Sequence, residues 1–61
     1  MEVNFYINQN CFAFYTDFEK ETSKSIYSIG MYGDEYRIEK ATKKVFKNKK
    51  FIGIAEYFEV F

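Results

Sequence analysis

The side chains that most often carry catalysis are scarce in this 61-residue sequence. Histidine is absent and Cys11 is the single cysteine, so the chain offers no histidine base and no Cys/His zinc site. Cys11 has no cation close to it in sequence, which argues against a reactive thiolate. Gly30, Gly33 and Gly53 match neither a phosphate-binding loop nor a dinucleotide fingerprint. The sequence therefore predicts a protein that is not an enzyme and that uses no metal or cofactor.

Charge is the first positive signal, because the basic residues are concentrated in one segment. From Tyr36 to Lys50 the sequence has seven basic residues against Glu39 alone, whereas the rest of the chain has two basic and eight acidic residues. Such a segment can be a solvated surface, can contact phosphates of nucleic acid, or can approach an acidic partner protein or the acidic side of a second subunit. The candidate contact residues are Arg37, Lys40, Lys43, Lys44 and Lys47.

The first part of the chain alternates as strands do. Val3, Phe5 and Ile7 alternate with polar residues, and the turn-like residues 8–10 lead to a second extended segment from Cys11 to Phe18. Two arrangements fit this pattern. One is a hairpin, and the other is a single long strand with a bulge.

The middle of the chain also allows two interpretations. We expect a loop over residues 19–24 and then a strand from Ser25 to Tyr32, with Tyr27, Ile29 and Met31 facing the core. A capping-box pattern at residues 16–19 leaves a helix over residues 17–29 as the alternative.

The basic segment is predicted to be a helix from Asp34 to Asn48. Gly33 ends the preceding strand, Asp34 can cap a helix, and Asn48 can take the left-handed conformation at the helix end. The apolar residues recur at steps of three and four, which is typical of a helix with one buried stripe: Ile38, Ala41, Thr42, Val45 and Phe46.

The last segment, Phe51 to Phe61, is predicted to be a strand with two apolar faces. Ile52, Ile54, Phe58 and Val60 would lie on one face, and Phe51, Ala55, Tyr57 and Phe61 on the other. The whole chain then forms one α+β domain over residues 1–61. It would be a mostly antiparallel sheet of three to four strands, in the order strand-strand-strand-helix-strand, with one helix across one face.

Aromatic residues are the second positive signal. The chain contains eight Phe and six Tyr, and one helix can cover only one face of the sheet. Strand twist and long side chains can hide some of these rings, but exposed aromatic clusters on a small protein are typical of an interface. We therefore expect binding to a partner protein, or to a second copy in a homodimer, through Tyr6, Tyr15, Tyr57 and Phe61.

The predicted helix and the last strand resemble the small early proteins by which bacteriophages disable host machinery. In the Dmd-type antitoxins of T-even phages the helix carries Lys-Ala-x-x-Lys-x-Phe-x-x-x-Lys, which Lys40, Ala41, Lys44, Phe46 and Lys50 match. An inhibitor of host RNA polymerase from the T-odd phages is similar in element order. The resemblance implies a compact, non-enzymatic inhibitor that occupies the surface of a bacterial host protein.

The sequence gives no sign of a membrane span or a signal peptide, because no apolar run approaches ~20 residues. We expect a cytoplasmic protein, in the host cell if a phage encodes it, with Cys11 as a small buried hydrophobic residue. The first functional hypothesis is a protein-binding, antitoxin-like inhibitor. The alternative is a nucleic-acid-binding protein that uses the basic helix over residues 36–50.

Overall fold

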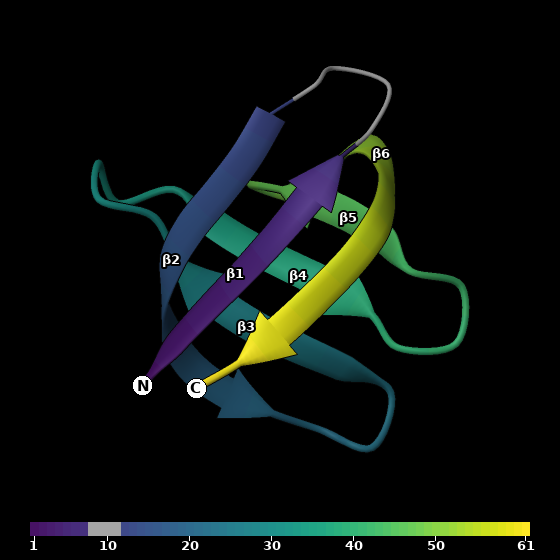
Figure 1. Cartoon of the computed structure of the whole chain (residues 1–61), viewed down its shortest axis with the longest axis horizontal. Coiled ribbons are helices and arrows are strands. Elements are labelled where there is room, and N and C mark those ends of the chain that lie inside the picture. Colours follow the sequence, from purple (N-terminus) through teal and green to yellow (C-terminus); the bar gives the residue numbers. More distant parts are fainter. Residues whose placement is uncertain (8–11) are drawn as a thin grey trace.

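The computed structural model describes residues 1–7 and 12–61, and every regular element in this part of the chain is a β-strand. Six antiparallel strands follow in sequence order, and β1 also pairs with β6, so the sheet closes into a barrel (Figure 1). The expected α+β fold, with a helix across an open sheet, is therefore wrong. The strands are β1 (Glu2–Ile7), β2 (Phe12–Glu21), β3 (Ser25–Ile29), β4 (Glu35–Glu39), β5 (Lys44–Lys47) and β6 (Lys50–Val60).

The segment predicted to be a helix forms β4, a turn and β5. Tyr36 and Ile38 are buried while the residues around them in β4 are not, which is the two-residue period of a strand. Ile38 and Val45, seven residues apart, lie directly opposite each other across the β4–β5 hairpin. A spacing of seven therefore arose from strand pairing and not from two turns of a helix. The β-branched and aromatic residues of this segment also favour strands over helices.

The two tight turns of this region depend on left-handed residues. Lys43 has φ 62° at the end of the β4–β5 turn, and Asn48 and Lys49 have φ 51° and 70° between β5 and β6. Positive φ at both central residues is the geometry of a type I′ hairpin turn. Asn48 was expected to be left-handed at a helix end, and it is left-handed in a hairpin. Its side-chain Oδ1 accepts from the Glu35 backbone N–H at 2.9 Å.

In the first half of the chain, the antiparallel pairing of β1 with β2 confirms the hairpin arrangement. The expected turn at residues 8–10 and the environment of Cys11 lie outside the described residues. β2 continues to Glu21, so the loop expected over residues 19–24 is wrong for its first half, and the alternative helix over residues 17–29 is not formed.

The predicted strand beginning at Ser25 is confirmed as β3, but its predicted orientation is wrong. Ile26 and Ser28 face the interior, whereas Tyr27 and Ile29 are only partly buried. The strand ends at Ile29, and Met31 is 82% exposed in the following turn. The interior of a small barrel has room for a limited number of large side chains, and the 1% exposed Ser28 occupies one of its positions.

The last strand also departs from the simple alternation that was expected. Its register shifts against β5 at Val45/Phe46 and against β1 at Tyr6/Ile7, as β-bulges do. Ala55 is consequently buried and Ile54 is 38% exposed, so neither of the two predicted faces is maintained along the whole strand. Beyond the second shift, Phe58 packs against the core.

The barrel interior contains an aromatic cluster. The rings of Phe5 and Phe14 stack with centroids 4.8 Å apart, and the ring of Tyr36 meets both edge-on at 5.5 and 5.6 Å. Apolar side chains from five of the six strands surround this cluster. The buried apolar residues of the core are Val3, Phe5, Ile7, Ile26, Tyr36, Ile38, Val45 and Ala55.

Burial of Tyr36 has a consequence at high pH. Its removal from water raises the pKa of the phenol above the ordinary value of 10.0; Lys47 lowers the pKa and Asp34 raises it, both by smaller amounts. The folded state therefore holds this proton more tightly than the unfolded state. The protonated Tyr36 phenol contributes fully to the stability of the fold below pH 10. This contribution is lost as the pH rises through the pKa that Tyr36 has in the folded state.

We expect the Tyr36→Phe variant to lose less stability than the wild type when the pH is raised above 10. Thermal unfolding of both proteins across this range measures the difference. Parallel loss of stability in the two proteins would contradict the assignment.

Candidate functional site

The four aromatic residues predicted to form an interface lie on one outer surface of the barrel, over β2, β1 and β6. Tyr6 is directly opposite Tyr57 across β1 and β6, and Asn4 lies between Tyr15 on β2 and Glu59 on β6. We call this surface the tyrosine face; its members are Glu2, Asn4, Tyr6, Tyr15, Asp17, Tyr57, Glu59 and Phe61. In Figure 1 the three strands lie side by side, with the two chain ends next to each other.

The aromatic side chains of the tyrosine face are accessible. Tyr15 is 71%, Tyr57 52% and Phe61 60% exposed, while Tyr6 is half-buried between its neighbours. Alternation explains the placement, because Val3 and Phe5 point into the barrel and the residues between them point out. Closure of the barrel then places β6 beside β1 and adds Tyr57 and Phe61 to the same surface.

The charge of the tyrosine face is negative. Three ion pairs, Arg37–Glu39, Lys40–Glu21 and Lys47–Asp34, use three of the nine residues of each sign and leave six of each. Half of the six remaining acidic residues belong to the tyrosine face. The six are Glu2, Asp17, Glu19, Glu35, Glu56 and Glu59.

A small acidic cavity adjoins Tyr15 on this face. Glu2 and Asp17 are directly opposite each other on β1 and β2, and neither forms an ion pair with any residue that the structure describes. Their cavity has a volume of about 250 Å³, and its other walls are Tyr15, Thr16, Ile29 and Met31. Two carboxylates opposed across strands repel, so this arrangement favours a cation bound between them. Its apolar walls suit the aliphatic part of a lysine or arginine side chain.

The five basic residues predicted to form a contact surface are not arranged on a helix. Arg37 and Lys44 lie on the outside of β4 and β5, Lys40 and Lys43 lie in the turn between them, and Lys47 is near the opposite end of β5. Three of the five are used in ion pairs, with Arg37 Nη1 3.0 Å from Glu39 Oε2 and Lys47 Nζ 3.6 Å from Asp34 Oδ2. The basic helix over residues 36–50, on which the nucleic-acid-binding hypothesis was based, is therefore not formed.

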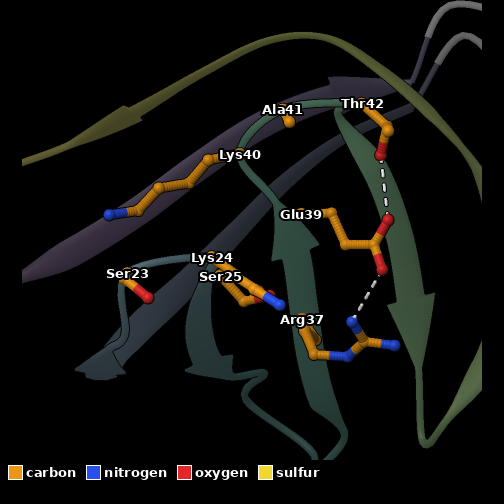
Figure 2. A pocket seen from close by; sticks show the side chains of 8 residues that line it. All are labelled: Ser23, Lys24, Ser25, Arg37, Glu39, Lys40, Ala41 and Thr42. Atoms are coloured by element: carbon orange, nitrogen blue, oxygen red, sulfur yellow. Dashed lines mark hydrogen bonds and ion pairs between the residues drawn. The ribbon is translucent and has the colours of Figure 1, made fainter.

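A second cavity, of about 580 Å³, adjoins the β4–β5 turn, and Figure 2 shows its lining side chains. Thr42 Oγ1 donates to Glu39 Oε1 at 2.9 Å and Arg37 Nη1 donates to Glu39 Oε2 at 3.0 Å. The bond from Thr42 and then that from Arg37 lower the pKa of the Glu39 carboxyl. This chain of hydrogen bonds fixes the turn and holds the Arg37 guanidinium against β5.

One arrangement was not foreseen from the sequence. A row of two cations and three rings crosses the outside of β2 to β6. Consecutive strand registers pair Lys20 with Tyr27, Tyr27 with Arg37, Arg37 with Phe46, and Phe46 with Phe51. Lys20 Nζ lies 4.8 Å from the ring centroid of Tyr27, and Arg37 Cζ lies 4.1 Å from that of Phe46. We call Lys20, Tyr27, Arg37, Phe46 and Phe51 the cation–aromatic row.

The sequence carried only a partial signal for this row. Its members come from five strands, so no local spacing relates them, and the helical interpretation placed Phe46 in a buried stripe. The alternation of Glu35, Arg37 and Glu39 with buried Tyr36 and Ile38 was the available clue that residue 37 faces outward.

The described residues were also searched for a cluster of metal ligands and for a membrane-spanning helix. Residues 1–7 and 12–61 contain no group of three or more acidic or cysteine side chains that could hold a metal ion. They also contain no helix with the length and apolarity needed to cross a membrane. Comparison with known proteins found no matching protein family, no matching curated protein and no matching solved structure.

Proposed function

We propose that this protein is a non-enzymatic binding protein whose tyrosine face covers a basic surface of a partner protein, and that it inhibits the partner by occlusion. The observation that carries the proposal is the pair of opposed carboxylates, Glu2 and Asp17, in a cavity beside the exposed Tyr15. An unbound protein gains nothing from this repulsion. A bound lysine or arginine of a partner neutralises it.

The aromatic residues supply the rest of the contact. Tyrosine is enriched among the residues that dominate binding energy, since its ring covers a large area at little entropic cost while its hydroxyl can form hydrogen bonds. A standard interface covers about 800 Å² on each partner. That is about one-fifth of the 4241 Å² surface of this barrel, which one face of three strands can provide.

The similarity to phage early inhibitors adds the expectation that the partner is a bacterial host protein. Its matched residues, Lys40, Ala41, Lys44, Phe46 and Lys50, lie on the β4–β5 turn, β5 and the start of β6. They are on other strands than the tyrosine face. The proposal therefore depends on the tyrosine face and not on the matched motif.

The double variant Glu2→Gln/Asp17→Asn tests the acidic cavity. We expect it to be about 0.5 kcal/mol more stable than the wild type, because the cross-strand repulsion is removed. We also expect it to lose partner capture from a nuclease-treated bacterial lysate, because the partner's cation no longer finds two carboxylates. Gain of stability together with loss of binding separates a binding role from a structural one.

A matched pair of aromatic variants completes this experiment. Tyr15→Ala combined with Tyr57→Ala should lose the same captured protein. Tyr32→Ala should retain it, since Tyr32 is 89% exposed but lies in the turn after β3. Unchanged capture by both double variants, with the fold intact, would overturn the proposal.

A further inference from the structure

We propose that the cation–aromatic row is a second binding site, which takes a single-stranded nucleic acid. The site shares no residue with the tyrosine face, and the inference does not rest on the function proposed for that face. Its ligand class follows from three observations: rings on the outside of the barrel, a guanidinium lying over one of them, and lysines without acidic partners on the same side.

The geometry of the row suits unpaired bases. Neighbouring strands are about 4.8 Å apart, so Tyr27 on β3 and Phe46 on β5 are separated by about 10 Å, with Arg37 between them. Arg37 Cζ lies over the Phe46 ring, 4.1 Å from its centroid. A guanidinium in this position can also contact the face of a base. Phe51 extends this surface, with its ring centroid 5.8 Å from that of Phe46 and a 52% exposed side chain.

A cavity beside the row can accommodate a base. It has a volume of about 190 Å³, and Tyr27, Tyr36, Arg37 and Phe46 form most of its wall. The remaining lining residues, Glu35 and Lys49, are polar. A carboxylate oxygen at that position can accept from the exocyclic amino group of a base. Lysine can contact the phosphate that follows it.

The surrounding charge suits a polyanion. Lys20, Lys44, Lys49 and Lys50 form no ion pair with any residue in the described part of the chain. They lie at both ends of the row and along its β5–β6 side. Positive charge and stacking rings thus share one surface of the barrel, which is the arrangement by which sheets bind single strands. A duplex offers the phosphates but not the faces of its paired bases, so the rings favour the single strand.

Fluorescence anisotropy at low salt, with a labelled single-stranded oligodeoxynucleotide that contains adenine and cytosine, tests the site. We expect the wild type to bind this single strand more tightly than the matching duplex. Contacts from four lysines predict a log–log salt slope of about −3. We expect Phe51→Ala to weaken binding about five- to hundredfold, the effect of losing one stacked base. Arg37→Gln should weaken binding as well, and it leaves all three rings of the row in place.

The controls keep the two surfaces distinct. Tyr57→Ala, on the tyrosine face, should leave oligonucleotide binding unchanged, and thermal unfolding should show that Phe51→Ala is folded. Absent binding, a duplex bound as tightly as the single strand, or unchanged affinity of both row variants would overturn the proposal. So would light scattering that shows wild-type dimers lost in Arg37→Gln without oligonucleotide binding, because the row would then bind a second copy of the chain.

Discussion

Replacement of Phe5 by alanine should remove a large part of the free energy of unfolding of this protein. Phe5 is 1% exposed, and its ring contacts both other members of the central aromatic cluster, Phe14 and Tyr36. Truncation of a buried phenylalanine costs about 3–5 kcal/mol, because a cavity remains where the ring was. A domain of this length has a total stability of about 3–9 kcal/mol. The single substitution therefore removes between about one third and all of the free energy of unfolding.

Urea unfolding followed by circular dichroism measures this effect. Phe61→Ala is the matched control, since it removes the same ring from a 60% exposed position, and its midpoint should stay close to that of the wild type. Phe5→Leu should fall between the two, because it fills part of the cavity. Equal midpoints for Phe5→Ala and Phe61→Ala would mean that Phe5 is not at the centre of the core.

The predictions that survived were those based on strict alternation. Val3, Phe5 and Ile7 were expected to face the core, and all three do. The register of β1 with β2 and β6 brings Tyr6, Tyr15 and Tyr57 to one outer surface, and their role in binding stays a prediction. The sequence lacked the information that these strands are neighbours, because β1 and β6 are at opposite ends of the chain.

The helix was predicted wrongly because a separation of seven residues fits two structures. Ile38 and Val45 would be on one stripe of a helix, and they are also direct partners in a hairpin whose turn is four residues long. The basic residues between them gave no help, because lysine is compatible with both. The positive φ angles of Asn48 and Lys49 distinguish the two structures, since two consecutive positive φ angles are typical of a tight hairpin and not of a helix end.

The β-bulges explain the errors in β6. Each bulge inserts one residue on one strand and exchanges the faces for all residues beyond it. The shift at Phe18/Lys20 affects which side of β2 meets Tyr27, and the shifts along β6 bury Ala55. Alternation in the sequence cannot locate such insertions, so the cation–aromatic row became visible only from the strand registers.

The two faces together give a division of charge on one small barrel. Acidic residues lie on the tyrosine face, which β2, β1 and β6 form. Lysines without an ion pair lie around the cation–aromatic row, which crosses the barrel from β2 through β3, β4 and β5 to β6. Opposite charges on separate faces let one molecule approach two partners of opposite charge. Binding of a nucleic acid would leave the tyrosine face open to its protein partner.

The tyrosine face depends on the pairing of β1 with β6, and an engineered disulfide can test this pairing. Asn4 and Glu59 are directly opposite each other in it, so cysteines at these positions should form a disulfide in a Cys11→Ser background. The disulfide would close a loop of about 55 residues, for which the chain-entropy relation gives a stabilisation of up to about 4 kcal/mol. This is the largest gain in stability that we expect from any change to the chain.

The matched control is Asn4→Cys/Glu56→Cys, in which the second cysteine is three residues out of register. At about 3.3 Å per residue it lies about 10 Å from its intended partner, too far for a disulfide in the folded barrel.

The decisive measurement is the urea midpoint of the Asn4→Cys/Glu59→Cys variant, oxidised and reduced. We expect the oxidised form to unfold at a clearly higher urea concentration, and we expect the Glu56 control to form no such bond while folded. A disulfide that forms equally in both variants, or that leaves the midpoint unchanged, would contradict the closed barrel and the tyrosine face that depends on it.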